Sequence, residues 1–116
     1  MIVGIGVDLC VVERFQAMLE RRPGLAERLL TPREQELSVQ SKAARFAAKE
    51  ALAKALHSPG GLRWLDAEVV KDPAGVPSFA LSGTVADRVS ELGITRIHLS
   101  LSHDGGFATA MVVCES

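Results

Sequence analysis

The sequence predicts an α+β fold in which a largely antiparallel sheet packs against an alanine-rich helix. Three observations predict this class. Helix-like and strand-like segments follow one another in the order β-α-α-α-β-β-α-β-β, which is typical of α+β proteins. The strands of the two C-terminal pairs are joined by short glycine-containing connections, residues 72–75 and 104–106, as in hairpins. Residues 43–56 contain seven alanines and neither glycine nor proline, which favours one long helix.

Hydrophobic periodicity, capping residues and turns place the elements along the chain. Residues 2–9 alternate as in a strand, with two glycines and Asp8 on one face and apolar side chains on the other. Thr31, Pro32 and Glu34 form the capping box that begins a helix. By such signals, helices are expected at residues 11–22, 31–39, 43–56 and 84–92, and strands at residues 65–71, 76–81, 94–102 and 107–114.

Length and composition indicate a single domain over residues 1–116 and exclude several classes of protein. An apolar content of 47% is too high for a disordered chain. A net charge of −1 and only 4% aromatic residues argue against nucleic-acid binding, and no apolar run reaches the roughly 20 residues that span a membrane. Cys10 and Cys114 lie in apolar runs, so two buried thiols are favoured over a disulfide, and we expect a cytoplasmic protein.

Asp8 is the first candidate for chemistry. It follows Gly4 and Gly6 on one face of the expected strand, and strand glycines often mark a place where a ligand or another backbone comes close. We therefore expect the glycines to leave a bare floor, with room for phosphates, that leads to this carboxylate. In the alternative interpretation, Asp8 caps the helix that follows.

Glu50 is the second candidate, because small and apolar residues surround it within the alanine-rich helix. A carboxylate in that setting is costly to desolvate unless a cation meets it. If the helix lies near the glycine face of the strand, Asp8 and Glu50 converge, and two carboxylates beside a phosphate are ligands that Mg²⁺ prefers. The alternative is an exposed ion pair between Glu50 and Lys54, four residues later on the helix.

Other motifs carry less weight. Gly4-x-Gly6 lacks the third glycine of a dinucleotide-binding fingerprint, and no phosphate-binding loop with the Gly-Lys-Ser/Thr ending occurs. Ser102, His103 and Asp104 are consecutive, so on a strand their side chains alternate in direction and do not form a triad. His103, at a strand end beside a glycine turn, is either functional or bound to the turn by a hydrogen bond.

Three motifs, in order along nearly the whole chain, resemble those of the holo-acyl-carrier-protein synthases, the small single-domain 4′-phosphopantetheinyl transferases. They are Gly4-Ile5-Gly6-Val7-Asp8, residues 45–55 (RFAAKEALAKA) and residues 98–104 (HLSLSHD). Gly75-Val76-Pro77 is a weaker fourth match and is equally typical of an ordinary β-turn. The resemblance implies the fold of that family and assembly as a trimer with active sites between subunits.

The activity that the resemblance implies is a Mg²⁺-dependent transfer of phosphopantetheine from coenzyme A to a serine of acyl carrier protein, as in fatty acid biosynthesis. Adenosine 3′,5′-bisphosphate is released. By position in the motifs, the metal-binding carboxylates match Asp8 and Glu50, and the lysine near the pyrophosphate matches Lys54. The coenzyme A contacts match Arg45, Gly75, Pro77 and His103, and the helix that docks an acidic helix of the carrier matches Arg14, Met18, Arg21 and Arg22.

The sequence departs from this family in two places. The segment between residues 37 and 45 is shorter than in many members, and residues 57–61 (HSPGG) replace a Gly-x-Gly turn. A second interpretation of the whole chain is a non-enzymatic oligomer that binds coenzyme A or a nucleotide and regulates a partner.

Overall fold

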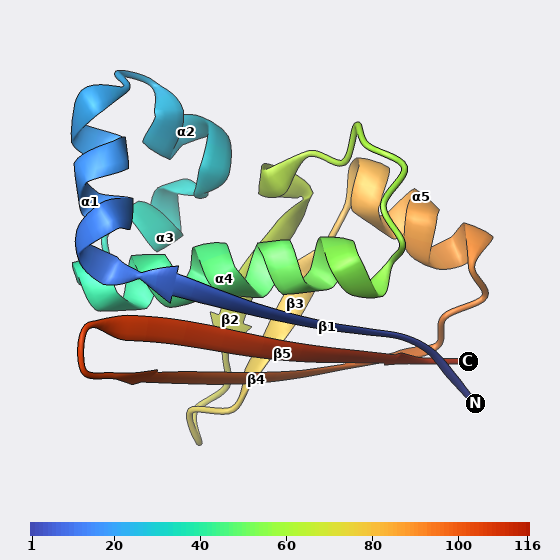
Figure 1. Cartoon of the computed structure of the whole chain (residues 1–116). Coiled ribbons are helices and arrows are strands. Elements are labelled where there is room, and N and C mark those ends of the chain that lie inside the picture. The colour runs from blue at the N-terminus through green and yellow to red at the C-terminus, as the bar shows by residue number, and fades with distance from the viewer.

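A three-stranded antiparallel sheet, in the order β1-β5-β4, forms the base of the molecule, and β2 and β3 form a separate hairpin. The computed structural model describes all 116 residues and confirms the predicted α+β class (Figure 1). The strands are β1 (Ile2–Val11), β2 (Ala67–Lys71), β3 (Pro77–Leu81), β4 (Arg96–Asp104) and β5 (Phe107–Glu115). The helices are α1 (Val12–Arg21), α2 (Leu25–Leu29), α3 (Pro32–Gln35), α4 (Val39–Ala55) and α5 (Gly83–Glu91), and a short 3₁₀ helix, Trp64–Asp66, precedes β2.

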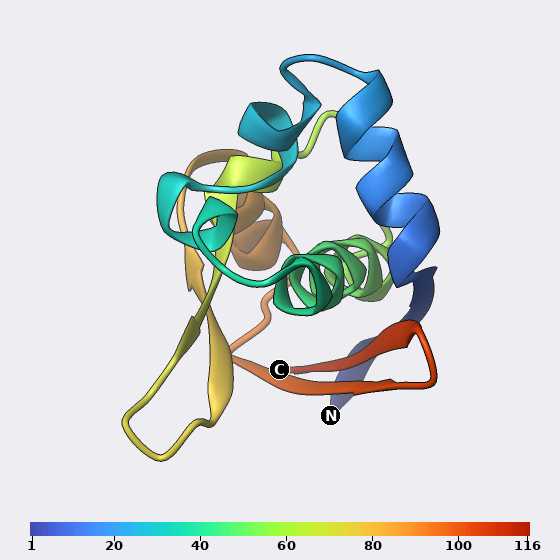
Figure 2. The ribbon, with the colours of Figure 1, turned by 90° about the vertical axis from the view of Figure 1, so that its left-hand side faces the viewer.

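Helix α4 lies along one face of the main sheet, and Figure 2 shows it nearly end-on above the strands. The helix face toward the sheet consists of alanines, of which Ala47, Ala51 and Ala55 are fully buried. Glycines in β1 allow the close approach. A Cβ on Gly4 would lie 1.9 Å from the carbonyl oxygen of Ala55, and a Cβ on Gly6 would lie 1.8 Å from that of Ala51. The alanine-rich helix therefore lies on the glycine face of β1, as the convergence of the two carboxylates requires.

The expectation that these glycines leave an open floor for phosphates is wrong. The backbone of α4 fills the space above them, because the small residues on both elements allow helix and strand to pack at van der Waals contact. Asp8, two residues farther along β1, remains 21% exposed at its side chain. The glycines thus set the distance between helix and strand, and the carboxylate is accessible beyond the last close contact.

Two of the expected helix boundaries are also wrong. The capping box of Thr31 and Glu34 is present, but the helix that it begins ends at Gln35 rather than at residue 39. Ser38 adopts an extended conformation and its side chain accepts a hydrogen bond from the backbone N–H of Ser41, so a new helix, α4, begins at Val39 instead of residue 43. The five-residue helix α2 was not expected, because it is too short to show a hydrophobic period.

Both cysteines are buried and free, as the sequence predicted. Cys10 and Cys114 lie on the face of the main sheet that α4 covers, together with Ala108, Ala110 and Val112 of β5. The opposite face of this sheet is different, because its apolar side chains remain about half exposed in the single chain: Ile5, Val7, Leu9, Phe107 and Met111, at 46–64%. No helix is both long enough and apolar enough to cross a membrane.

Candidate active site

Asp8 and Lys54 form an ion pair between β1 and α4. The Lys54 ammonium donates a hydrogen bond to the backbone carbonyl of Val7, at 2.9 Å, and lies 3.3 Å from Oδ1 of Asp8. The Lys54 side chain is 57% exposed, so the pair lies at the surface. The N-cap position of α1 is Val11 and no side chain caps that helix, so the alternative interpretation of Asp8 as a helix cap is wrong.

Glu50 lies one helical turn before Lys54 and belongs to the same cluster. Burial raises the pKa of the Glu50 carboxyl, the negative charge of Asp8 raises it further, and Lys54 acts in the opposite direction. The Glu50 carboxylate makes no hydrogen bond or ion pair, and Lys54 pairs with Asp8 instead. The alternative interpretation of Glu50 and Lys54 as an exposed ion pair on one helix is therefore wrong.

The chemistry of this cluster fits a divalent cation. Burial and, to a lesser degree, the charge of Asp8 raise the pKa of Glu50, and a single lysine compensates only part of the charge of the two carboxylates. No group of three or more aspartate, glutamate, histidine or cysteine side chains gathers anywhere in the chain. Mg²⁺ suits such a sparse site, because it commonly takes one or two carboxylates and completes its shell with water and substrate phosphates.

Arg45 forms a second cluster on the other side of α4. It lines a pocket of about 320 Å³ together with Ser41 and Ala44 of α4, Lys71 at the end of β2, and residues 101–103 of β4. The Arg45 side chain is buried to 6% exposure, and its Nε has no hydrogen-bond partner. Burial lowers the pKa of its guanidinium, with Glu34 acting in the opposite direction. A buried cationic donor without a partner is costly, so this pocket is suited to an anion.

His103 opens onto the same pocket. It pairs with Ala108 within the ladder between β4 and β5, so the strand extends past the residue 102 boundary expected from the sequence. The His103 ring makes no hydrogen bond, and the interpretation that it ties the turn together is not supported. The sequence reasoning missed Lys71, which adds a second full positive charge to the pocket. Its only signal was a lysine at the very end of a strand.

The two clusters lie on opposite sides of α4. Asp8 is on β1 and His103 is on β4, at the two edges of the main sheet with β5 between them. Two strand spacings amount to about 10 Å, and α4 packs over the sheet between the two edges. Within one chain, α4 and the width of the sheet therefore separate the Asp8 cluster from the Arg45 pocket.

The expected carrier-docking residues form an exposed row on α1. Arg14 and Arg21 are exposed and Met18 is partly buried between them, at the i, i+4 and i+7 positions of one helix face. Arg22 is also exposed but lies just beyond the helix, where the backbone is extended. None of these three arginines makes a salt bridge, so the row presents uncompensated positive charge.

Gly75 and Pro77 lie at the tip and the base of the β2–β3 turn, and neither lines the Arg45 pocket. Gly75 has a positive φ of 84°, and the side chain of Asp72 accepts hydrogen bonds from the backbone N–H groups of Ala74 and Val76. These contacts are those of an ordinary turn. Pro77 pairs with Lys71, which does line the pocket, so the connection to that site is indirect.

The sequence reasoning also missed a buried ion pair behind the site. The Nζ of Lys49 lies 2.6 Å from Oε1 of Glu34, and both side chains are 1% exposed. Burial lowers the pKa of the Lys49 ammonium, whereas the hydrogen bond to Glu34 acts in the opposite direction. A signal was present: Lys49 precedes Leu52 and Leu56 at helical spacing, so it lies on an apolar face of α4.

The chain is similar to known proteins over its whole length. The model of a family described as the 4′-phosphopantetheinyl transferase superfamily matches residues 4–112. A holo-[acyl-carrier-protein] synthase of Clavibacter michiganensis subsp. michiganensis is 58% identical over 115 residues, which is 99% of this chain and 97% of that protein.

Two solved structures share the fold. The holo-[acyl-carrier-protein] synthase of Neisseria meningitidis is 33% identical, with a TM-score of 0.87 and 100% of both chains covered. The holo-(acyl-carrier-protein) synthase of Bacillus anthracis in complex with CoA (3′,5′-ADP) is 37% identical, with a TM-score of 0.80, and the match covers 100% of this chain and 98% of that one. The chain belongs to the 4′-phosphopantetheinyl transferase superfamily, with the fold and the motifs of the holo-acyl-carrier-protein synthases.

Proposed function

We propose that this protein transfers 4′-phosphopantetheine from coenzyme A to a serine of acyl carrier protein in a Mg²⁺-dependent reaction that releases adenosine 3′,5′-bisphosphate. The observation that carries the proposal is the cluster of Asp8, Glu50 and Lys54 on β1 and α4. The names of the relatives supply the reaction, and the coenzyme A and 3′,5′-ADP in the Bacillus anthracis structure match the proposed substrate and product.

Each residue of the cluster has a role in this reaction. Asp8 and Glu50 would hold the Mg²⁺, which when bound neutralises charge on the pyrophosphate of coenzyme A. Lys54 is held by the carbonyl of Val7, so its ammonium is fixed where it can balance charge on the departing phosphate. Glu50 accepts the proton of the attacking serine.

The nucleotide end of coenzyme A fits the Arg45 pocket. The adenosine part of coenzyme A carries a 3′-phosphate, and the pocket offers Arg45 and Lys71 as cations and His103 as a further donor. The unpartnered Nε of Arg45 supports this assignment, because a phosphate oxygen would satisfy it. The contact of Gly75 and Pro77 with coenzyme A stays a prediction of the resemblance.

We further propose that the active enzyme is a homotrimer. Two observations support an assembly in which coenzyme A binds between subunits. The Asp8 cluster and the Arg45 pocket of one chain are separated by α4, which supports a site that the pocket of a neighbouring chain completes. The outer face of the main sheet exposes Ile5, Val7 and Leu9, and an apolar patch of this kind is typical of an interface.

The carrier protein is proposed to dock on α1. Arg14 and Arg21 would attract an acidic helix of the carrier, and Met18 between them offers a flexible apolar contact. Because Asp8 lies on the strand that leads directly into α1, a carrier bound there brings its serine near the metal site. Both cysteines are free, which is usual in the cytoplasm, and we place the reaction there as a step that serves fatty acid biosynthesis.

Mass spectrometry of the carrier tests this function. The protein is incubated with coenzyme A, Mg²⁺ and an apo acyl carrier protein, and the carrier is then weighed. We expect the carrier to gain the mass of one phosphopantetheine, and we expect no gain with Asp8→Asn or Glu50→Gln. Binding of coenzyme A without any gain on apo carriers would instead favour the non-enzymatic regulatory oligomer.

A further inference from the structure

Lys49 and Glu50 are consecutive residues of α4 whose side chains leave the helix in different directions. Whereas Glu50 lies beside Asp8, the Lys49 ammonium is buried behind the helix and uses all three of its donors. It donates to the backbone carbonyl of Leu29 at 2.7 Å, to Oε1 of Glu34 at 2.6 Å and to the backbone carbonyl of Trp64 at 3.1 Å.

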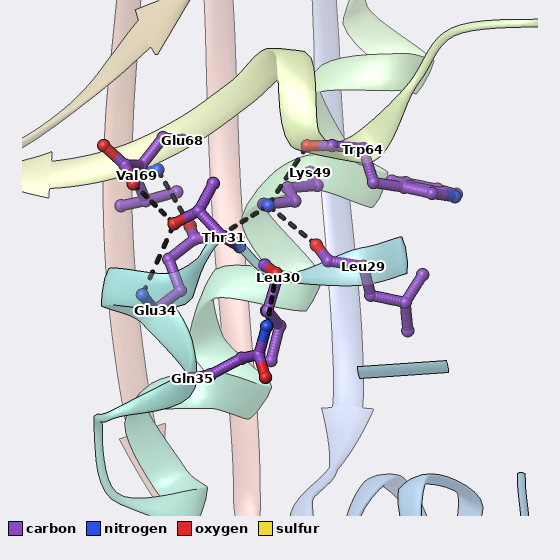
Figure 3. A network of polar contacts seen from close by, with 9 residues as sticks. All are labelled: Leu29, Leu30, Thr31, Glu34, Gln35, Lys49, Trp64, Glu68 and Val69. Carbon is purple, nitrogen blue, oxygen red and sulfur yellow. Dashed lines mark hydrogen bonds and ion pairs between the residues drawn. The ribbon is translucent and has the colours of Figure 1, made fainter. Parts of the chain in front are cut away.

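Glu34 extends these contacts to two further segments, as Figure 3 shows. Its Oε1 also accepts a hydrogen bond from the backbone N–H of Thr31, and its Oε2 accepts one from the backbone N–H of Val69, both at 2.9 Å. The ion pair of Lys49 and Glu34 therefore ties the middle of α4 to the end of α2, the start of α3, the 3₁₀ helix and β2.

The opposite face of α4 is tied to β1 by the Lys54 side chain, which lies at the C-terminal end of the helix and is exposed, but nothing comparable holds the middle of this face. It meets the sheet through alanines, and β1 opposes them with glycines, so no large side chain interlocks across this contact. Phe46 packs against Phe15 and Trp64 on another side of α4, with ring centroids 5.2 and 6.0 Å apart, and such pairs contribute about 0.5–1.5 kcal/mol beyond their buried area. Directional hydrogen bonds near the middle of the helix come from Lys49 alone.

A small rotation of α4 about its axis matters at the metal site. A carboxylate at the rim of a helix lies about 5–6 Å from the axis, so a rotation of about 20° moves it by about 2 Å. That displacement equals a whole Mg²⁺–oxygen bond of about 2.0–2.1 Å, and Mg²⁺ demands near-ideal geometry. The rotation of α4 therefore decides whether Glu50 and Asp8 bind the same ion.

We propose that Lys49, through its ion pair with Glu34, is a positioning residue that fixes the rotation of α4 and thereby places Glu50 for metal binding. This inference rests on the proposed function, because it takes Asp8 and Glu50 as the metal ligands. Lys49 touches neither substrate nor metal in this assignment. Its effect is on the affinity for the ion and not on the chemical step.

Titration of Mn²⁺, followed by electron paramagnetic resonance at saturating coenzyme A, tests the inference on the assembled protein. We expect Lys49→Met to weaken Mn²⁺ binding about tenfold and to lower the thermal midpoint, because the Glu34 charge is left buried without a partner. In the double variant Lys49→Met/Glu34→Gln that charge is gone. We expect its thermal midpoint to recover in large part, whereas Mn²⁺ binding stays weak.

Two controls separate positioning from general loss of stability. Ile94→Ala removes a buried side chain from the segment between α5 and β4, which carries neither the ion pair of Lys49 nor Asp8, and it should lower the thermal midpoint without changing Mn²⁺ affinity. In turnover assays, excess Mg²⁺ should restore the activity of Lys49→Met but not that of Glu50→Gln.

The outcomes distinguish failure of this inference from failure of the proposed function. If Mn²⁺ affinity recovers together with stability in the double variant, or is unchanged in Lys49→Met, Lys49 is a structural residue only and the inference is overturned. If the unmodified protein binds no Mn²⁺, or if Glu50→Gln binds it equally well, the metal site itself is overturned, and the inference with it.

Discussion

Lys49 and Glu50 are neighbours in the sequence and carry opposite charges, yet they have opposite relations to the fold. The Lys49 side chain is 1% exposed and every donor is satisfied within the protein. Glu50 is partly buried and has no hydrogen-bond partner, and burial together with the charge of Asp8 raises the pKa of its carboxyl. The Lys49 ammonium has all its hydrogen-bond partners within the protein, whereas the Glu50 carboxylate lacks them.

This difference separates structural charges from candidate functional charges. A buried charge that has found all its partners stabilises one arrangement of the chain. A partly buried charge that lacks partners is retained at a cost in stability, and such groups cluster at active sites. Arg45, with its unpartnered Nε, belongs with Glu50 by this criterion.

The largest effect is expected from Gly6→Ala, which removes the contact on which both side chains depend. The new Cβ would lie 1.8 Å from the carbonyl oxygen of Ala51, an atom of helix backbone that cannot move aside alone. We expect a loss of at least about 3 kcal/mol in the free energy of unfolding, or no folded protein. Chemical denaturation measures it. Gly24→Ala is the control, because a Cβ there meets no atom within 4 Å and only the positive φ is strained.

The second largest effect is expected from Lys49→Met, which removes the buried charge that has all its partners within the protein. It leaves the Glu34 carboxylate buried without its cation, so the free energy of unfolding should fall by about 3–5 kcal/mol. Urea denaturation of the unmodified protein and the variant measures the change. A loss below about 1 kcal/mol would show that water enters and satisfies Glu34, contrary to the closed network in Figure 3.

Glu50→Gln should change the free energy of unfolding in the opposite direction. In metal-free protein at pH 7 the variant removes a partly desolvated charge beside Asp8, so we expect the free energy of unfolding to increase. Solvent screening limits the gain to about 0.5–1 kcal/mol. Thermal denaturation in the presence of a chelator measures it, and the same variant should be inactive in the carrier assay. A destabilised variant would mean that the Glu50 charge already has a partner.

The increase in the free energy of unfolding of Glu50→Gln should also depend on pH. The folded-state pKa of Glu50 lies above its ordinary value of 4.5, so between the two values the folded protein binds more protons than the unfolded chain. The charged Glu50 carboxylate therefore destabilises the folded protein by its full amount at neutral pH. This destabilisation declines as the pH falls through the raised pKa and is absent below about 4.5. Denaturation of both proteins from pH 7 to pH 4 should therefore show their difference shrinking toward zero.

The smallest expected effect concerns the uncompensated charges on α1. Arg14→Glu should raise the KM for the carrier protein about five- to tenfold with little change in the KM for coenzyme A, because exposed charges mainly steer encounter. Steady-state kinetics with each substrate varied in turn measures both. Arg96→Glu, at the start of β4, is the matched control. Equal changes in both KM values would contradict the assignment of α1 as the docking surface.

Much of the architecture was predictable because it depends on local signals. Alternation in β1, the alanine content of α4, the capping box at Thr31 and the glycine turns each act within a few residues. The motifs also identified Asp8, Glu50 and Lys54 as one cluster. Short elements were not predictable: α2 spans five residues and α3 four, which is less than two helical turns.

By itself, the sequence determined the α+β class, the family and the candidate residues for the chemistry, because these follow from local periodicity and from motifs read along the chain. Only the tertiary structure decided which cation meets which carboxylate. Lys54 pairs with Asp8 rather than Glu50, Lys49 pairs with Glu34, and Lys71 joins Arg45. The members of these three pairs lie 46, 15 and 26 residues apart in the sequence, and the packing of helix against strand fixes such contacts. The spacing of residues along the sequence does not reveal which of these side chains meet.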